Sequence, residues 1–178
     1  MNIPKAKLKA IIRYFCTNTS AVFLGKVKLM KLFYFLDFLH VKKYGRPVTY
    51  DTYVNLEHGP IPSEILNLVN SVVDDPEHAI LSDTISIERP VDINMQKIVC
   101  VKPFKEEDTR YLSDSEVEII QIVCKRFGDK NTKYIEDASH KESPWKKTVE
   151  LQTIPYTLAA EDSDCFVKKE DIALLARV

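Results

Sequence analysis

Apolar positions recur at helical spacing over the first quarter of the chain. Between Pro4 and Thr17 they repeat every three or four residues with lysines between them, which predicts an amphipathic helix. The stretch 27–43, "VKLMKLFYFLDFLHVKK", is apolar on more than one side, as is typical of a central helix covered by other elements. Gly45 and Pro47 follow it, so we expect a left-handed cap and a proline break to end this helix.

The middle of the chain changes from helical to alternating patterns. The β-branched and aromatic residues of "PVTYDTYVNL" predict a strand or extended segment, and a helix is predicted from position 62 or 63 to about 73. Residues 79–103 alternate in "ISIE" and again in "KIVCVK", which predicts a small hairpin. The loop of that hairpin is expected to hold Arg89, Pro90 and Asn94.

Helix signals dominate the second half. Ser113 with Glu116 forms a capping box before an apolar stretch that stops at Gly128, which predicts a helix over 113–127. Further helices are predicted from Asn131 or Thr132, from Pro144, and in "KKEDIALLAR". The patterns together predict a predominantly helical α+β fold. We expect a single domain over 1–178, with a long central buried helix and a small antiparallel sheet or hairpin.

Length and cysteine usage narrow the class of protein. A chain of 178 residues can bury a sizeable core, and we find no repeat, linker or low-complexity tract that would divide it. Its four cysteines are too far apart for a CxxC pair, which favours reduced thiols in a cytoplasmic protein. A secretion signal is not expected, and the longest apolar run is too short to cross a bilayer, so we expect no membrane contact.

Charge is distributed unevenly along the chain. Residues 1–46 hold ten Lys or Arg and one acid, a net +9, whereas the rest hold 15 bases and 25 acids, a net −10. The two halves either neutralise each other on folding, or the basic part forms a face that attracts an acidic partner or a phosphate backbone. The sequence leaves both interpretations open.

Motifs for nucleotide or nucleophilic chemistry are missing from the sequence. Four scattered glycines form no phosphate loop, and neither a GxSxG elbow nor an HExxH helix occurs, so no cofactor is expected. Asp37 and His40 share a helix face and, with His58 and His140, could in principle assemble a metal site, although their spacing is not metal-specific. More often such residues bond to the backbone or to each other. A buried Asp37 needs partners, for which Tyr34, His40 and Arg46 are the candidates.

The stretch "EHGPIPSEI", residues 57–65, combines a histidine with a Gly-Pro break. We interpret it as a rigid turn in which Gly59 permits an unusual backbone angle and the two prolines direct the chain into a helix. This interpretation gives His58 no role in the turn, so we expect His58 to be either a partner contact or a polar link in the core. Trp145, the only tryptophan, is either a core residue or an interface anchor.

An ordered set of motifs resembles the Panacea domain of SocA-like antitoxins, a family also described as phage-associated proteins. The resemblance covers about residues 6–150 and leaves 151–178 as a C-terminal helical tail. The matching segments are Lys28-Leu29-x-Lys31-Leu32 with Asp37, Tyr44-Gly45-Arg46-Pro47, Tyr53, Gly59-Pro60-x-Pro62, Leu112-Ser113 with Glu116, Ser139-His140 with Glu142, and Pro144-Trp145.

This resemblance implies a mostly helical, non-enzymatic antitoxin that neutralises a cognate toxin, encoded next to it, by direct contact. The insert at 79–103 and the tail after 150 depart from the family pattern, and partner choice would lie there or on the basic N-terminal face. The alternatives are a regulator that binds operator DNA through that face, and a metal-dependent hydrolase. The candidate partner-binding residues are Lys28, Lys31, Asp37, His40, Arg46, His58, His140 and Trp145.

Overall fold

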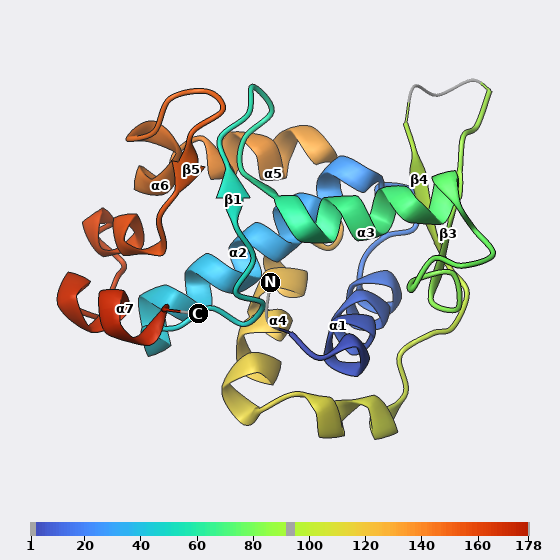
Figure 1. The fold of residues 1–178 in the computed structure, drawn as a ribbon, viewed down its shortest axis with the longest axis horizontal. Coiled ribbons are helices and arrows are strands. Elements are labelled where there is room, and N and C mark those ends of the chain that lie inside the picture. The colour runs from blue at the N-terminus through green and yellow to red at the C-terminus, as the bar shows by residue number, and fades with distance from the viewer. Residues whose placement is uncertain (1–2, 92–94, 178) are drawn as a thin grey trace.

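The long helix α2, Lys26–Tyr44, runs through the middle of the molecule in the computed structural model, which describes residues 3–91 and 95–177 (Figure 1). Helices α4 (Asp114–Phe127) and α5 (Thr132–Ser139) pack directly on α2. Helix α1, Lys5–Asn18, packs against α4 and joins its apolar face to the same core. The predicted central buried helix and the predominantly helical α+β fold are therefore confirmed.

Helix ends follow the local signals in the sequence. Gly45 has φ +78°, and its N–H donates to the Val41 carbonyl in a left-handed cap. Ser113 caps α4 in the predicted capping box with Glu116. Gly128 also ends α4, but with right-handed backbone angles. A Cβ there would lie 2.8 Å from the Asn18 carbonyl oxygen, so glycine is needed at this position because the ends of α1 and α4 lie very close together.

The remaining helices also lie where the patterns predict them. Helix α3, Ser63–Asp74, begins directly after the rigid turn. The short α6, Ser143–Lys146, has a proline in its first turn, and α7, Lys169–Leu175, is the terminal helix. The structure adds two 3-10 helices that the patterns do not predict, η1 (Glu106–Tyr111) and η2 (Tyr156–Glu161).

Two small sheets complete the fold. Strands β3 (Ile85–Glu88) and β4 (Lys97–Cys100) form the predicted antiparallel hairpin, with Ile85 opposite Cys100; Asn94 lies outside the described residues. In the second sheet β1, Tyr53–Val54, is flanked by β2, Ile61–Pro62, and β5, Thr153–Ile154. The strand predicted from "PVTYDTYVNL" is thus only two residues long. The segment after residue 150 is not purely helical, because it supplies β5.

The C-terminal segment packs back onto the central helix. Helix η2 lies against α2 and α7 lies against η2, as the red and orange ribbons beside the blue helix show (Figure 1). The Tyr156 ring meets the Phe38 ring with centroids 5.1 Å apart. In the described ranges, no helix combines the length and apolarity that crossing a bilayer requires.

Candidate functional site

Asp37 lies fully buried on α2 and accepts five hydrogen bonds. Its Oδ1 accepts the backbone N–H groups of Val48 and Thr49, both at 2.8 Å. Its Oδ2 accepts the hydroxyls of Thr49, Tyr53 at 2.9 Å and Tyr156 at 3.3 Å. None of the expected partners Tyr34, His40 and Arg46 takes part, so that prediction is wrong. The carboxylate instead ties α2 to the segment that follows it and to the C-terminal part of the chain.

Two lysines of α2 are buried and bound to backbone carbonyls. Lys28 Nζ donates to the carbonyls of Gly128 and Lys130 at 2.9 and 2.6 Å. Lys31 Nζ donates to the Pro60 carbonyl at 2.7 Å, inside the rigid turn, and burial lowers the pKa of Lys31 to about 7. Because neither ammonium group reaches the surface, both lysines position other elements of the molecule.

The rigid turn at Gly59 lies directly on this lysine and on helix α5. Gly59 has φ +90°, as the sequence predicts, and a Cβ there would meet Ser139 Oγ at 2.6 Å and Lys31 Nζ at 3.1 Å. The His140 ring stacks on Trp145 with centroids 4.0 Å apart and planes 19° from parallel. His58, at the tip of the turn, is exposed and faces Glu136, with Nδ1 to Oε1 at 3.3 Å. The structure therefore brings Lys31, His58, His140 and Trp145 together.

We expect Gly59→Ala to lower the free energy of unfolding by about 2 kcal/mol, because the methyl group would enter an occupied space at a backbone angle that alanine disfavours. Urea denaturation measures this loss. The double variant Gly59→Ala/Ser139→Ala should regain the stability lost through the 2.6 Å contact with Ser139 Oγ. It should not regain the stability lost because alanine disfavours the positive φ angle. Wild-type stability of the single variant would show that this turn is not constrained.

A pocket of about 510 Å³ opens beside Trp145. The indole Nε1–H donates to the Leu56 carbonyl at 3.3 Å, so one edge of the ring is held by the β1–β2 connection while the residue remains half-buried. Trp145 is therefore neither a fully buried core residue nor a fully exposed one, and its role as an interface anchor stays a prediction. Glu57 and Glu150 also line this pocket.

The loop on one side of this pocket is held by Asn55. Its side-chain amide donates to the carbonyls of Trp145 and Thr148 at 3.0 and 2.9 Å. Its backbone carbonyl accepts the Leu151 N–H at 2.8 Å. Leu151 has φ +67° and is 76% exposed, and Val149 is 72% exposed. No pattern in the sequence indicates this loop, because its order depends on contacts with a strand about ninety residues earlier.

His40 lies apart from the other histidines. Its Nδ1 is 2.6 Å from the Arg46 carbonyl and its Nε2 is 3.0 Å from Ser115 Oγ. Asp37 bonds elsewhere, and the described residues include no group of three or more His, Cys, Asp or Glu side chains placed to hold a metal ion. The hypothesis of a metal site from Asp37, His40, His58 and His140 is therefore wrong in its geometry.

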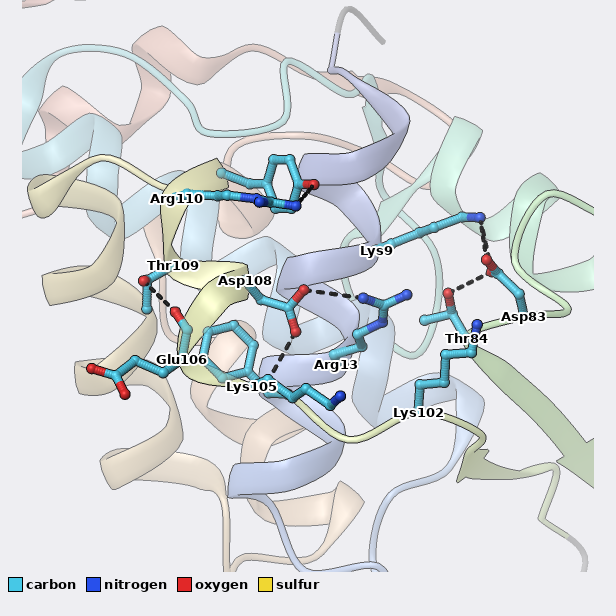
Figure 2. A network of polar contacts seen from close by, with 12 residues as sticks. Lys9, Arg13, Asp83, Thr84, Lys102, Lys105, Glu106, Asp108, Thr109 and Arg110 are labelled. Atoms are coloured by element: carbon cyan, nitrogen blue, oxygen red, sulfur yellow. Dashed lines mark hydrogen bonds and ion pairs between the residues drawn. The ribbon is translucent and has the colours of Figure 1, made fainter.

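Most bases of residues 1–46 have partners within the molecule. Figure 2 shows Lys9 paired with Asp83 and Arg13 paired with Asp108, at 2.8 and 3.1 Å. Within the part of the chain that the structure describes, only Lys5 and Arg46 of these ten bases lack a side-chain hydrogen bond or ion pair. Five of these bases pair with carboxylates and three bond to neutral oxygens, so within the described residues few of them are left for a free basic face that could bind operator DNA. The further ion pairs are Lys7–Glu116, Lys42 with Glu142, Asp162 and Asp164, and Lys43–Glu118.

The family model of the antitoxin SocA-like, Panacea domain matches residues 29–146. The chain belongs to this family. The match begins in α2 and ends at Lys146, so it contains Asp37, the Gly59 turn and the His140–Trp145 stack. Helix α1 and the segment from residue 147 onward lie outside the matched range. No curated protein and no solved structure gave a significant match.

The candidate partner-binding residues in and next to the matched range divide by position. Lys28, Lys31, Asp37 and His40 are buried and hold helices and turns in place. His58 and Arg46 are exposed, and Trp145 is half-buried beside an open pocket. His58, Arg46 and Trp145 are therefore accessible at the surface, whereas Lys28, Lys31, Asp37 and His40 are not, and the partner-binding role of these residues stays a prediction.

Proposed function

We propose that this Panacea-domain protein is the antitoxin of a bacterial or phage toxin–antitoxin pair, and that it neutralises its cognate toxin in the cytoplasm by direct protein contact, without catalysis. The observation that carries the proposal is the family match over residues 29–146. A binding role also agrees with the exposed apolar side chains around the Trp145 pocket, since such groups are typical of protein interaction sites.

The toxin-binding surface that we propose consists of His58, Trp145, Val149 and Leu151, here called the Trp145 face. Val149 and Leu151 expose apolar side chains on a loop that Asn55 holds in one conformation, so little conformational entropy is lost on binding. The half-buried indole supplies a flat aromatic contact at the centre of this face.

Co-expression with the protein encoded by the neighbouring gene tests both parts of the proposal. We expect the wild type to restore growth and to co-purify with that protein, and Val149→Asp/Leu151→Asp to lose both effects while unfolding like the wild type. Val22→Asp is the matched control, because Val22 is 71% exposed but lies in the connection between α1 and α2, outside the Trp145 face. Failure of the wild type would overturn the antitoxin function. Full neutralisation by the double variant would overturn only the Trp145 face.

A further inference from the structure

A second open pocket, of about 400 Å³, lies where the connection after α2 meets η1 and the start of α4. It is separate from the Trp145 face, because the two share no lining residue. Three of its side chains are cationic and one is a carboxylate, Glu116. The side chains used in the argument are Lys7, Arg46, Tyr50, Arg110, Tyr111 and Ser113.

The pocket retains two positive charges after its internal pairing. Lys7 bonds to Glu116, so these two charges cancel. Among residues 3–91 and 95–177, neither the Arg46 nor the Arg110 guanidinium group forms an ion pair, although Glu107 stands three residues before Arg110 in η1. Asp108, in η1 near Arg110, is already bound by Arg13 at 3.1 Å (Figure 2). Two unpaired guanidinium groups on one pocket attract an anion strongly.

Both arginines are held by neighbouring groups. The Arg110 guanidinium lies over the Tyr111 ring, 4.8 Å from its centroid, and donates to the Tyr111 hydroxyl at 2.7 Å. Arg46 is held through its backbone, because the buried His40 ring donates from Nδ1 to the Arg46 carbonyl at 2.6 Å. With that tautomer, Nε2 accepts the hydroxyl of Ser115 at 3.0 Å.

His40 in this way connects two walls of the pocket. Ser115 Oγ lies 3.1 Å from Ser113 Oγ, and Ser113 is the N-cap of α4 as well as a lining residue. Burial lowers the pKa of His40, which keeps the ring neutral and able to accept the Ser115 hydrogen bond. The loop of Arg46 and the start of α4 are therefore fixed relative to each other before any ligand binds.

We propose that this pocket binds the phosphate dianion of a phosphomonoester. Two planar guanidinium groups match the charge and the oxygen geometry of such a group. The rings of Tyr50 and Tyr111 offer flat surfaces for a planar group attached to the phosphate, as in a nucleoside 5′-monophosphate. This activity goes beyond toxin neutralisation and does not depend on it.

Isothermal titration calorimetry at constant ionic strength tests the proposal, at a pH of about 8 where a phosphomonoester carries two charges. We expect inorganic phosphate and adenosine 5′-monophosphate to bind, and adenosine and acetate not to bind measurably. Tighter binding of the nucleotide than of phosphate would identify a nucleotide as the ligand class, and equal binding would identify the phosphate group alone.

Arg46→Gln and Arg110→Gln should each weaken phosphate binding about tenfold, since a charge-assisted hydrogen bond contributes at least this factor. Both arginines are exposed, so both variants should unfold like the wild type. Lys5→Gln is the matched control, because Lys5 is an exposed base of α1 that does not line the pocket. Undiminished phosphate binding by either arginine variant, or acetate binding equal to that of phosphate, would overturn the proposal, as would a wild type that binds no phosphate at millimolar concentration.

Discussion

Replacing Asp37 by alanine should lower the free energy of unfolding by about 4 kcal/mol, the magnitude typical of removing one member of a buried, fully hydrogen-bonded charged group. The change leaves two backbone N–H groups and three hydroxyls without their common acceptor in the core. It also removes the hydrogen bond from Tyr156, so the C-terminal segment loses a polar link to the central helix, although Tyr156 keeps its ring contact with Phe38 and its hydrogen bond to the Asp51 carbonyl. Urea denaturation followed by circular dichroism measures the loss.

Asp137→Ala is the matched control. Asp137 is a half-exposed acid whose partner, Lys133, stands four residues earlier on the surface of α5. Exposed pairs of this kind contribute little to stability, so the control should unfold almost like the wild type. Equal losses in the two variants would contradict the central role of Asp37.

The pH dependence of stability provides a second test of this carboxylate. Burial raises the pKa of Asp37 to about 6. The hydrogen bonds from Thr49, Tyr53 and Val48 favour the ionised form and lower the pKa, but their effect is smaller than that of burial. The unfolded chain has an ordinary pKa of about 4, so between these values the folded protein holds more protons than the unfolded one. The contribution of Asp37 is therefore fully present below about pH 4 and is lost as the pH rises through about 6.

Asp37→Asn cannot titrate at this position. Relative to this variant, the wild type should lose about 2 kcal/mol of stability between pH 4 and pH 7, since each unit of pKa difference corresponds to about 1.4 kcal/mol and this pH range covers most of the difference. Denaturation of both proteins at several pH values gives this difference, and titrations of unrelated groups cancel. A difference that stays constant over this range would mean that Asp37 remains ionised throughout.

The partners of Asp37 show which contacts can be predicted from a single sequence and which cannot. Its burial follows from the apolar helix around it, but the sequence candidates Tyr34, His40 and Arg46 were all its near neighbours along the chain. The actual hydrogen-bond donors to Asp37 include Tyr156, more than a hundred residues later. Periodicity and capping depend on local spacing, so they located the helices, the Gly45 cap and the Gly59 turn. They missed β5, because a two-residue strand is too short to show an alternation.

The partners of the charged residues could not be predicted from the sequence either. Counting charges revealed an N-terminal excess of bases and predicted two outcomes, but it could not assign a carboxylate to each base. The pairs depend on which elements pack together: η1 brings Asp108 to Arg13 on α1, and the C-terminal segment brings Asp162 and Asp164 to Lys42 on α2. Among the described residues, the bases that folding leaves without a side-chain partner are Lys5 and Arg46, and of these two only Arg46 lines a pocket.

Lys42 holds the densest of these ion clusters, so Lys42→Met should lower the free energy of unfolding by about 4 kcal/mol, as removal of one partner from a buried ion pair does. Its side chain is 3% exposed, and its ammonium group lies 2.6 Å from Glu142, 3.0 Å from Asp162 and 2.9 Å from Asp164. Without it, three carboxylates would face each other with no cation between them. Urea denaturation at neutral pH measures the loss.

The neighbouring Lys43 gives a matched control, because its ammonium group pairs with Glu118 on the surface. Lys43→Met should unfold almost like the wild type. Burial raises the pKa of Glu142, although the charge of Lys42 acts in the opposite direction. Protonation of Glu142 at lower pH removes one of the three negative charges, and so it relieves part of the repulsion that Lys42→Met creates. The deficit of Lys42→Met should therefore shrink as the pH falls toward about 5, and Lys42→Met/Glu142→Gln should recover part of it at neutral pH. A deficit independent of pH and unchanged by the second substitution would assign the loss to the packing of the lysine stem rather than to its charge.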